Sequence, residues 1–310
     1  MKFNLKLATV AAACALTSLA HADVAFDANF ENNSTATGAQ GATGDSFTNN
    51  GRVELNAKTT LKNGSNFISG KGTLIVGQNG NSNGSSPVTI DDAWLKLGNS
   101  SFDVQIGRFE ATNLFPLGKD NVVAPALSTG YRAGTLRGRI TTTTSAPAHG
   151  VVGVNAGMLR FELGAFVSSN TAGEVYGLRP TVGFTAGALA VTAGLEAIKT
   201  NNPAVANSTG LGLTAAYALS STGSININYA RNDDLKTNSF GLNGTFGDFG
   251  IGFIKDSNEA TSASANTLYA AYSFPLLGIK GATITPAFST STGTGVQALQ
   301  VLGLRLAYGF

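Results

Sequence analysis

The chain has 310 residues, of which 43% are hydrophobic and only 12% are charged, with 20 basic residues against 18 acidic ones. Soluble domains carry about 25% charged residues, so this composition is unusual for a soluble protein. The near-balance of charge argues against a nucleic-acid-binding protein, because such a protein shows a basic face. Cys14 is the single cysteine, which excludes intrachain disulfides and thiolate metal clusters.

The first 22 residues have the three parts of a secretory signal peptide. Lys2 and Lys6 form a basic start, residues 7–19 form an apolar run, and the sequence AHA at 20–22 is a cleavage site. The run is too short for a membrane-spanning helix, which needs about 20 residues. Cys14 lies inside the run, which argues against a lipoprotein signal. We predict cleavage after Ala22 and a thiol-free mature chain, residues 23–310, with balanced charge.

After residue 23 the apolar residues alternate with polar ones at the period of a β-strand. In RVELNAKTTLK, for example, Val53 and Leu55 alternate with Glu54 and Asn56. One face of such a strand suits lipid and the other suits water, so we predict an all-β fold, a transmembrane antiparallel β-barrel. We expect sixteen strands, at residues 24–31, 51–62, 66–77, 88–98, 102–109, 131–142, 150–168, 174–186, 188–199, 208–219, 223–231, 236–246, 249–257, 265–274, 281–290 and 296–310.

The expected connections alternate between short turns and longer loops, as in barrels with short periplasmic turns. Longer loops are expected at 32–50, 78–87, 110–130, 200–207 and 257–264. Residues 150–168 could also form a hairpin about Gly157, but bacterial barrels have even strand numbers, which favours one long strand. No change of composition divides residues 23–310, so we predict one barrel domain with both ends on the periplasmic side.

The segment FEATNLFPLGKDNVVAPALS follows the strand SFDVQIGR and is too long for a simple hairpin. With the preceding DDAWLKLGN, it resembles the general and solute-selective porins of Gram-negative bacteria. In that family a strand ending in Gly-Arg, here Gly107-Arg108, precedes a third loop that folds into the lumen. The resemblance covers residues 92–132, the signal peptide and the last strand. The opening DVAFDANFEN departs from the family's usual first strand, which leaves the subfamily open.

The resemblance implies a pore narrowed by the third loop, with acidic loop residues facing a basic wall. The expected constriction residues are Arg108, Glu110, Lys119, Asp120, Arg132, Arg137 and Arg139. Arg137 and Arg139 share one face of the expected strand 131–142, and a charge facing lipid costs about 2–4 kcal/mol near the midplane, so both should face the lumen. Arg108 shares its face with lipid-facing Ile106, and a bulge at Gly107 would turn it inward. Solvation at the rim is the alternative for these arginines.

The last nine residues, LGLRLAYGF, end the chain on an aromatic side chain. Leu302, Leu304, Leu306, Tyr308 and Phe310 share one face, and by the same resemblance they form a signal for the barrel-assembly machinery. Arg305 has the opposite orientation and should face the lumen. So should Asp92, Trp94 and Lys96, which share a face of the strand at 88–98.

No motif indicates an enzyme, a metal site or a cofactor. His149, the only histidine after position 21, lies beside Pro147 and Gly150 in an expected turn. The run GSNFISGKGT lacks the spacing of a phosphate-binding loop. The pair Asp91-Asp92 supplies too few ligands for Ca²⁺.

These observations predict an outer-membrane porin for passive diffusion of small hydrophilic solutes and ions. The family resemblance implies a homotrimer formed through small apolar outward residues. The alternatives are a structural or adhesive barrel without channel activity and a secreted all-β protein outside the membrane. General diffusion and selectivity for carbohydrates or organic anions both stay open.

Overall fold

The computed structural model describes residues 24–39, 41, 45–79, 88–138, 148–170, 173–203 and 206–310. The predicted signal peptide and Arg139 lie outside these residues. No helix in the described part of the chain has the length and apolar character needed to cross a membrane.

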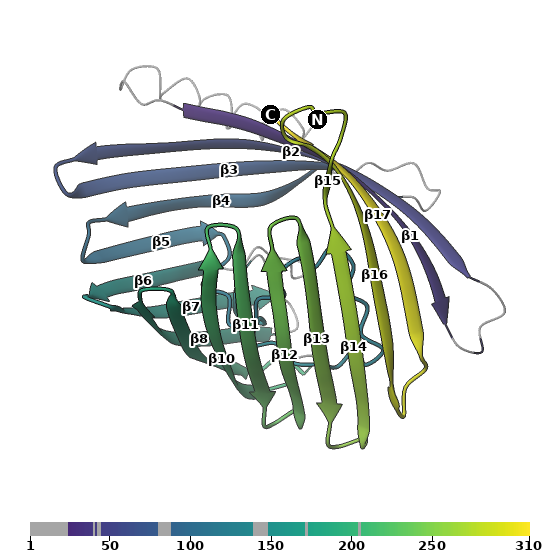
Figure 1. Cartoon of the computed structure of the whole chain (residues 1–310). Helices are drawn as coiled ribbons and strands as arrows, with labels where there is room; N and C mark the ends of the chain where they lie inside the picture. The colour runs from purple at the N-terminus through teal and green to yellow at the C-terminus, as the bar shows by residue number, and fades with distance from the viewer. Residues whose placement is uncertain are drawn as a thin grey trace, which may run out of the picture.

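The described residues form one antiparallel sheet that closes on itself (Figure 1). Successive strands pair with each other, and β1 pairs with both β2 and β17, which completes the ring. The strands are β1 (Val24–Ala39), β2 (Ser46–Asn63), β3 (Asn66–Asn79), β4 (Val88–Gly98), β5 (Phe102–Arg108), β6 (Ala148–Ala156), β7 (Leu159–Asn170), β8 (Gly173–Ala186), β9 (Leu189–Thr200), β10 (Ser208–Ser220), β11 (Gly223–Asn232), β12 (Thr237–Phe246), β13 (Phe249–Asn258), β14 (Ala263–Tyr272), β15 (Phe274–Pro275), β16 (Ala282–Thr294) and β17 (Leu299–Gly309). β15 is a two-residue piece, and β14 pairs directly with β16, so sixteen long strands of the described chain form the barrel, as predicted.

Two of the predicted strands are wrong, and their errors cancel in the count. Residues 150–168 are a hairpin of β6 and β7, turning at Gly157, whose φ of 62° is a conformation that glycine adopts readily. Residues 131–138 contain no strand, only a single bridge between Glu110 and Gly138, so they extend the preceding loop. In the prediction, the requirement for an even number of strands favoured one long strand at 150–168. The structure has sixteen long strands although this segment is a hairpin, because residues 131–138 add no strand.

β1 and β2 are longer than predicted. The alternation of apolar residues ends near residue 31, but pairing continues to Thr37↔Ser46. Side-chain hydrogen bonds support this part of the pairing: Asn32 and Asn49 exchange two, at 3.1 and 2.9 Å, and Thr35 contacts Thr48 at 2.6 Å. Most of the loop expected at 32–50 is therefore strand.

The barrel is apolar outside and polar inside. Along β17 and at the residue that follows it, the five outward side chains at 302, 304, 306, 308 and 310 are 36–72% exposed. The inward face carries buried polar groups instead, among them Asn56, Asn228, Ser239, Asp256 and Thr267. A soluble protein buries its apolar face, whereas a barrel in lipid shows the arrangement seen here.

A change of register between β3 and β4 preserves this division of faces. Gly72 pairs with Ala93 but Leu74 pairs with Ile90, so β4 has an extra residue opposite Thr73. The extra residue is a bulge, and it reverses which alternate positions face outward. Ile90 and Leu95, which have different sequence parity, are therefore both exposed on the outer face.

The first part of β1 meets residue 310 at the edge of the barrel with the short turns. The Ala28 amide donates to the Phe310 carbonyl at 2.9 Å, and the Phe310 amide donates to the Ala28 carbonyl at 3.0 Å. The terminal residue therefore takes part in closing the ring.

Candidate functional site

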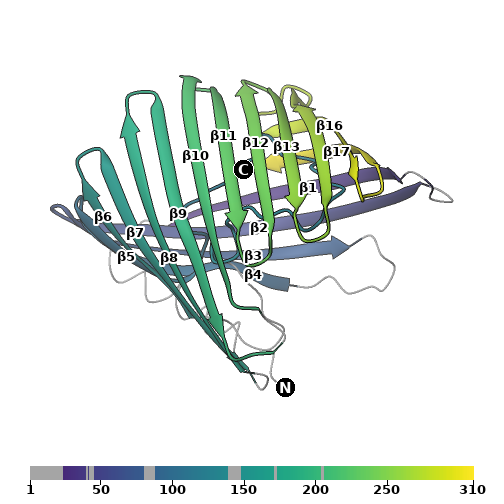
Figure 2. The same ribbon diagram turned by 90° about the horizontal axis from the view of Figure 1, so that it is seen from below.

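Residues 109–138, called the inward loop below, fold into the interior of the barrel (Figure 2). Leu114 and Ala133 are fully buried, although neither belongs to a strand. The Leu114 carbonyl accepts a hydrogen bond from Thr214 of β10 at 2.8 Å, and the Ala126 amide donates one to Ser291 of β16 at 2.8 Å. The loop thus contacts the inner wall on strands far apart around the ring.

Glycines on the inward face let the loop approach the wall closely. A Cβ atom on Gly210 would overlap the phenol of Tyr131, and one on Gly303 would overlap a methyl group of Val122. A glycine inside a strand weakens the strand but admits another backbone or side chain at short range. The loop and the glycines of the wall therefore fit together.

A buried carboxylate holds the returning half of the loop. Glu196 of β9 is 2% exposed and accepts hydrogen bonds from the Tyr131 hydroxyl at 2.7 Å and the Leu136 amide at 2.8 Å. The Thr135 amide also donates to Glu196, at 3.1 Å. Burial raises the pKa of the Tyr131 phenol, and the neighbouring Glu196 charge raises it further, so the phenol stays a donor at physiological pH.

Arg179 of β8 completes this cluster from the other side. Its Nε donates to Glu196 at 3.1 Å, and its Nη2 donates to the loop carbonyls of Thr112 at 2.8 Å and Ala133 at 3.2 Å. Because both charged side chains are 2% exposed, each depends on the other for compensation. We call Glu196, Arg179 and Tyr131 the loop anchor.

Arg132, which we expected on a wall strand at 131–142, lies instead in the inward loop and pairs with a carboxylate of the wall. Its Nη2 lies 2.9 Å from Asp256 Oδ2, and Asp256 is fully buried and also accepts a hydrogen bond from Ser239 at 2.6 Å. The guanidinium lies 5.4 Å from the centre of the Phe115 ring, a cation–π contact within the loop.

Arg137 pairs with Glu110 inside the loop, and not across the lumen. Its Nη2 lies 2.8 Å from Glu110 Oε2, and both side chains are about one-third exposed. The basis for expecting Arg137 to face the lumen from a strand is wrong, because residues 131–138 are not a strand. Arg139, which we expected on the same face as Arg137, lies outside the described residues.

Lys119 and Asp120 lie where the loop reaches the end with the short turns. Lys119 donates to the carbonyl of Asp248, in the turn between β12 and β13. Burial lowers the pKa of Lys119, and the Asp248 charge opposes this shift in part. Asp120 is exposed.

Arg108 stays on the outward side of β5. It pairs with Ala93 in a register that runs through Gly107 without a shift, so the expected bulge does not occur. Its Nε donates to the Ile90 carbonyl at 2.9 Å. The structure does not bring Arg108 together with Glu110 and Arg137.

The predicted wall residues lie on the inward faces of β4 and β17. Asp92 pairs with Lys71 at 2.8 Å, and Lys96 pairs with Asp103 at 3.1 Å. Trp94, half-buried, lies between Asp92 and Lys96 on the same face of β4. Arg305 donates to Asn33 at 2.7 Å and lies 3.9 Å from Glu31.

Sequence reasoning missed the residues that fix the loop, namely Arg179, Glu196 and Asp256. Alternation along GLRPTVG and AGLEAI would have turned Arg179 and Glu196 inward, because Leu178 and Leu195 face outward. No signal in the sequence indicated that these two side chains meet each other and the loop.

His149 is the second residue of β6 and is not in a turn, contrary to the prediction. Its ring stacks on Phe109 with 4.3 Å between the centroids, and neither ring nitrogen has a hydrogen-bond partner among the described residues. In the described part of the chain, no group of three His, Cys, Asp or Glu side chains is placed to hold a metal ion.

Comparison with known proteins finds solved structures with a similar fold. No protein-family model matches the chain, and no curated protein sequence does. Among solved structures, a variant of the porin of Rhodopseudomonas blastica with two introduced tryptophans aligns with a TM-score of 0.63 at 12% identity. A variant with one introduced tryptophan aligns with a TM-score of 0.64 at 12% identity. Each alignment covers 92% of this chain and 100% of the other. The chain has the sixteen-stranded barrel fold of the Gram-negative outer-membrane porins.

Proposed function

We propose that this protein is an outer-membrane porin through which small hydrophilic solutes and ions diffuse passively. The observation that carries the proposal is the closed ring of strands with an exposed apolar outer face and a polar inner face. Such a ring satisfies its backbone hydrogen bonds in lipid and presents a polar wall to water. The predicted signal peptide supports export, and the outward row that ends at Phe310 supports recognition by the barrel-assembly machinery.

The inward loop sets the radius of the proposed channel. Selectivity then depends on that radius and on the charges that remain accessible beside it. The Arg137–Glu110 pair is about one-third exposed on both sides, whereas Asp256, the partner of Arg132, is buried. We therefore assign the larger share of ion preference to Glu110 and Arg137.

A homotrimer, which the family resemblance implies, finds support on the outer face of β1–β4. A recess of about 530 Å³ lies there, and small residues (Ala28, Ala57, Gly72 and Ala93) contribute to its lining. Small side chains let a neighbouring barrel approach closely, which a face of large side chains would not. We place the contact between subunits on this face.

Planar-bilayer recording of refolded residues 23–310 tests the channel. We expect discrete conductance steps, grouped in threes if the trimer inserts as a unit, with a sedimentation mass of three barrels in detergent. Absence of steps from protein with native β-structure would contradict the porin proposal and favour a structural or adhesive barrel. Single steps together with a monomeric mass would contradict only the trimer.

Replacement of Arg137 by alanine tests the assignment of ion preference. The variant removes one positive charge beside the Glu110 carboxylate, so the reversal potential in a KCl gradient should move toward cation preference. The double variant Glu110→Ala with Arg137→Ala removes both charges and should remain near the wild type. If the single variant has the wild-type reversal potential, this pair does not determine the ion preference.

A further inference from the structure

A second recess lies inside the barrel, between the inward loop and the wall formed by β7, β8 and β9. Its volume is about 560 Å³, within the range of small-molecule sites. Thr112 of the loop contributes to the lining at one side, and Arg160 and Glu162 of β7 contribute at another. Gly157 and Met158, in the short turn between β6 and β7, also line it, which places the recess toward the end of the barrel with the short turns.

The floor of the recess is open because of Gly183. A Cβ atom added there would have only the Arg160 carbonyl oxygen and Thr192 Oγ1 nearby, each 3.9 Å away. Gly183 has a negative φ, which other residues also adopt, so the backbone does not require a glycine here. The chain could carry a larger residue at 183, and the glycine leaves room for a solute.

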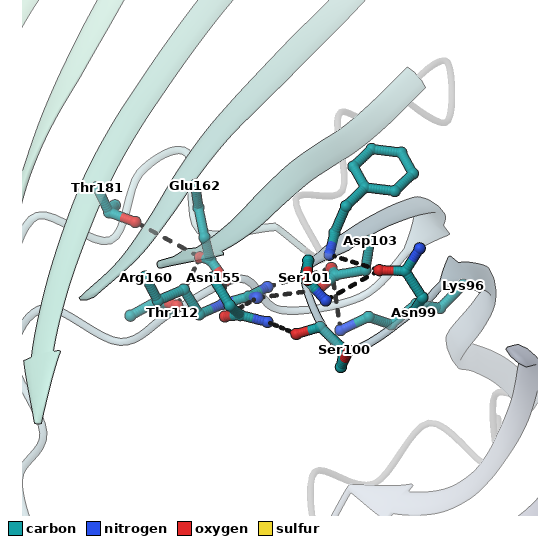
Figure 3. A network of polar contacts seen from close by, with 11 residues as sticks. Lys96, Asn99, Ser100, Ser101, Asp103, Thr112, Asn155, Arg160, Glu162 and Thr181 are labelled. Atoms are coloured by element: carbon teal, nitrogen blue, oxygen red, sulfur yellow. Dashed lines mark hydrogen bonds and ion pairs between the residues drawn. The ribbon is translucent and has the colours of Figure 1, made fainter. Parts of the chain in front are cut away.

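The charges at the edge of the recess compensate one another (Figure 3). Arg160 donates through Nε to Glu162 at 2.8 Å and through Nη1 and Nη2 to Asp103 at 2.9 and 3.1 Å. Asn155 accepts a further hydrogen bond from Nη1 at 3.0 Å, and Lys96 lies 3.1 Å from Asp103. Two cations therefore stand against two carboxylates, and four of the five Arg160 N–H groups are engaged.

This compensation disfavours an ionic ligand. An anion would have to displace Asp103 or Glu162 from Arg160, and a cation would meet the Arg160 and Lys96 charges. A neutral molecule faces neither cost, because it needs only hydrogen-bonding groups and no net charge.

Hydroxyl groups supply those hydrogen-bonding groups. Thr112 and Thr181 donate to Glu162 Oε2 at 2.6 and 3.5 Å, the second of which is too long to be strong. Among the described residues, no hydrogen bond engages the side-chain hydroxyls of Thr185 and Thr192, which also line the recess. A hydroxyl both donates and accepts, so these groups match the hydroxyls of a polyol.

We propose that this recess is a binding site for a neutral polyhydroxylated solute of monosaccharide size, occupied during transit at the end of the channel with the short turns. The inference rests on the proposed channel function and names a solute class for it. The Thr185 and Thr192 hydroxyls and the Glu162 carboxylate bind the solute, and Gly183 provides the space.

The test uses single-channel current in planar bilayers with increasing concentrations of glucose. Binding should reduce the current of the wild-type channel in a saturable way, beyond the fall in conductivity of the solution itself. Gluconate and glucosamine, which have similar size but opposite charges, should give no saturation. If glucose reduces the current only in proportion to the conductivity of the solution, the recess is not a binding site. That result would not contradict the proposed channel function.

Two kinds of variant locate the effect. The double variant Thr185→Val with Thr192→Val keeps the branched shape and should raise the half-blocking glucose concentration roughly tenfold, as the loss of two hydrogen bonds implies. Gly183→Leu should abolish saturation by filling the recess. Matched controls are Thr245→Val on β12 and Gly77→Leu on β3, which change the inner wall elsewhere and should leave the block unchanged.

A saturable block that survives both the double valine variant and Gly183→Leu would overturn the proposed site and place the binding elsewhere in the lumen. Absence of any conductance steps in the wild type would contradict the proposed channel function and, with it, the proposed binding site.

Discussion

Replacing Glu196 by alanine will release the returning half of the inward loop. The change removes the acceptor of the Tyr131 hydroxyl and of the Thr135 and Leu136 amides, and it leaves Arg179 buried without a carboxylate. Breaking a buried ion pair by removing one partner costs about 3–5 kcal/mol. We expect the free energy of unfolding to fall by that order, and single-channel conductance and open-channel noise to rise as the loop leaves the wall.

A milder variant and a covalent lock separate loop release from general destabilisation. Tyr131→Phe keeps the ring against Gly210 and removes one hydrogen bond to a charged group, which costs about 1.5–3 kcal/mol. A Cβ on Gly303 would lie 3.5 Å from Val122 Cβ, within the range for a disulfide, so Val122→Cys with Gly303→Cys ties the loop to β17. In residues 23–310 these would be the only cysteines. Equal conductance of the Glu196→Ala protein with this disulfide oxidised and reduced would contradict a role of Glu196 in holding the loop.

Exchanging Leu304 and Arg305 will place a charge in the lipid without changing composition. Leu304 is 42% exposed at the centre of β17, and Arg305 points inward to Asn33. The double variant Leu304→Arg with Arg305→Leu should lower the free energy of unfolding from lipid bilayers by about 2–4 kcal/mol for the lipid-facing arginine. The single variant Arg305→Leu is the control, because it loses only the inward contacts. Equal stability of the exchanged and control proteins would mean that this face is not in contact with lipid.

Alternation predicted most of the barrel because each side chain in a strand sees one of two different solvents. It located the long strands from β8 onward closely and gave the right total. It failed where pairing did not require apolar residues: the outer halves of β1 and β2 hold together through Asn, Ser and Thr side chains. It also failed at residues 131–138, where alternating apolar residues pack against the wall and not against lipid. Tyr131, Ala133 and Leu136 are buried there.

The charge pairs near the candidate constriction differ from the expected arrangement, in which acidic loop residues face arginines of the wall. Arg132 does meet a carboxylate, but that carboxylate is Asp256 of β13, more than one hundred residues later in the chain. Arg137 and Glu110 meet each other because a single bridge joins the two ends of the loop at Glu110 and Gly138. Such pairings depend on the path of the loop, which has no periodicity from which to infer it.

By itself, the sequence determined the class of fold and the division into an apolar and a polar face, since these follow from local alternation. The tertiary structure alone decided where the inward loop runs, which charges compensate each other, and where the lumen keeps open space. The physical reason is range: alternation acts between neighbouring residues, whereas the Glu196 anchor and the recess above Gly183 arise from segments brought together only when the ring closes.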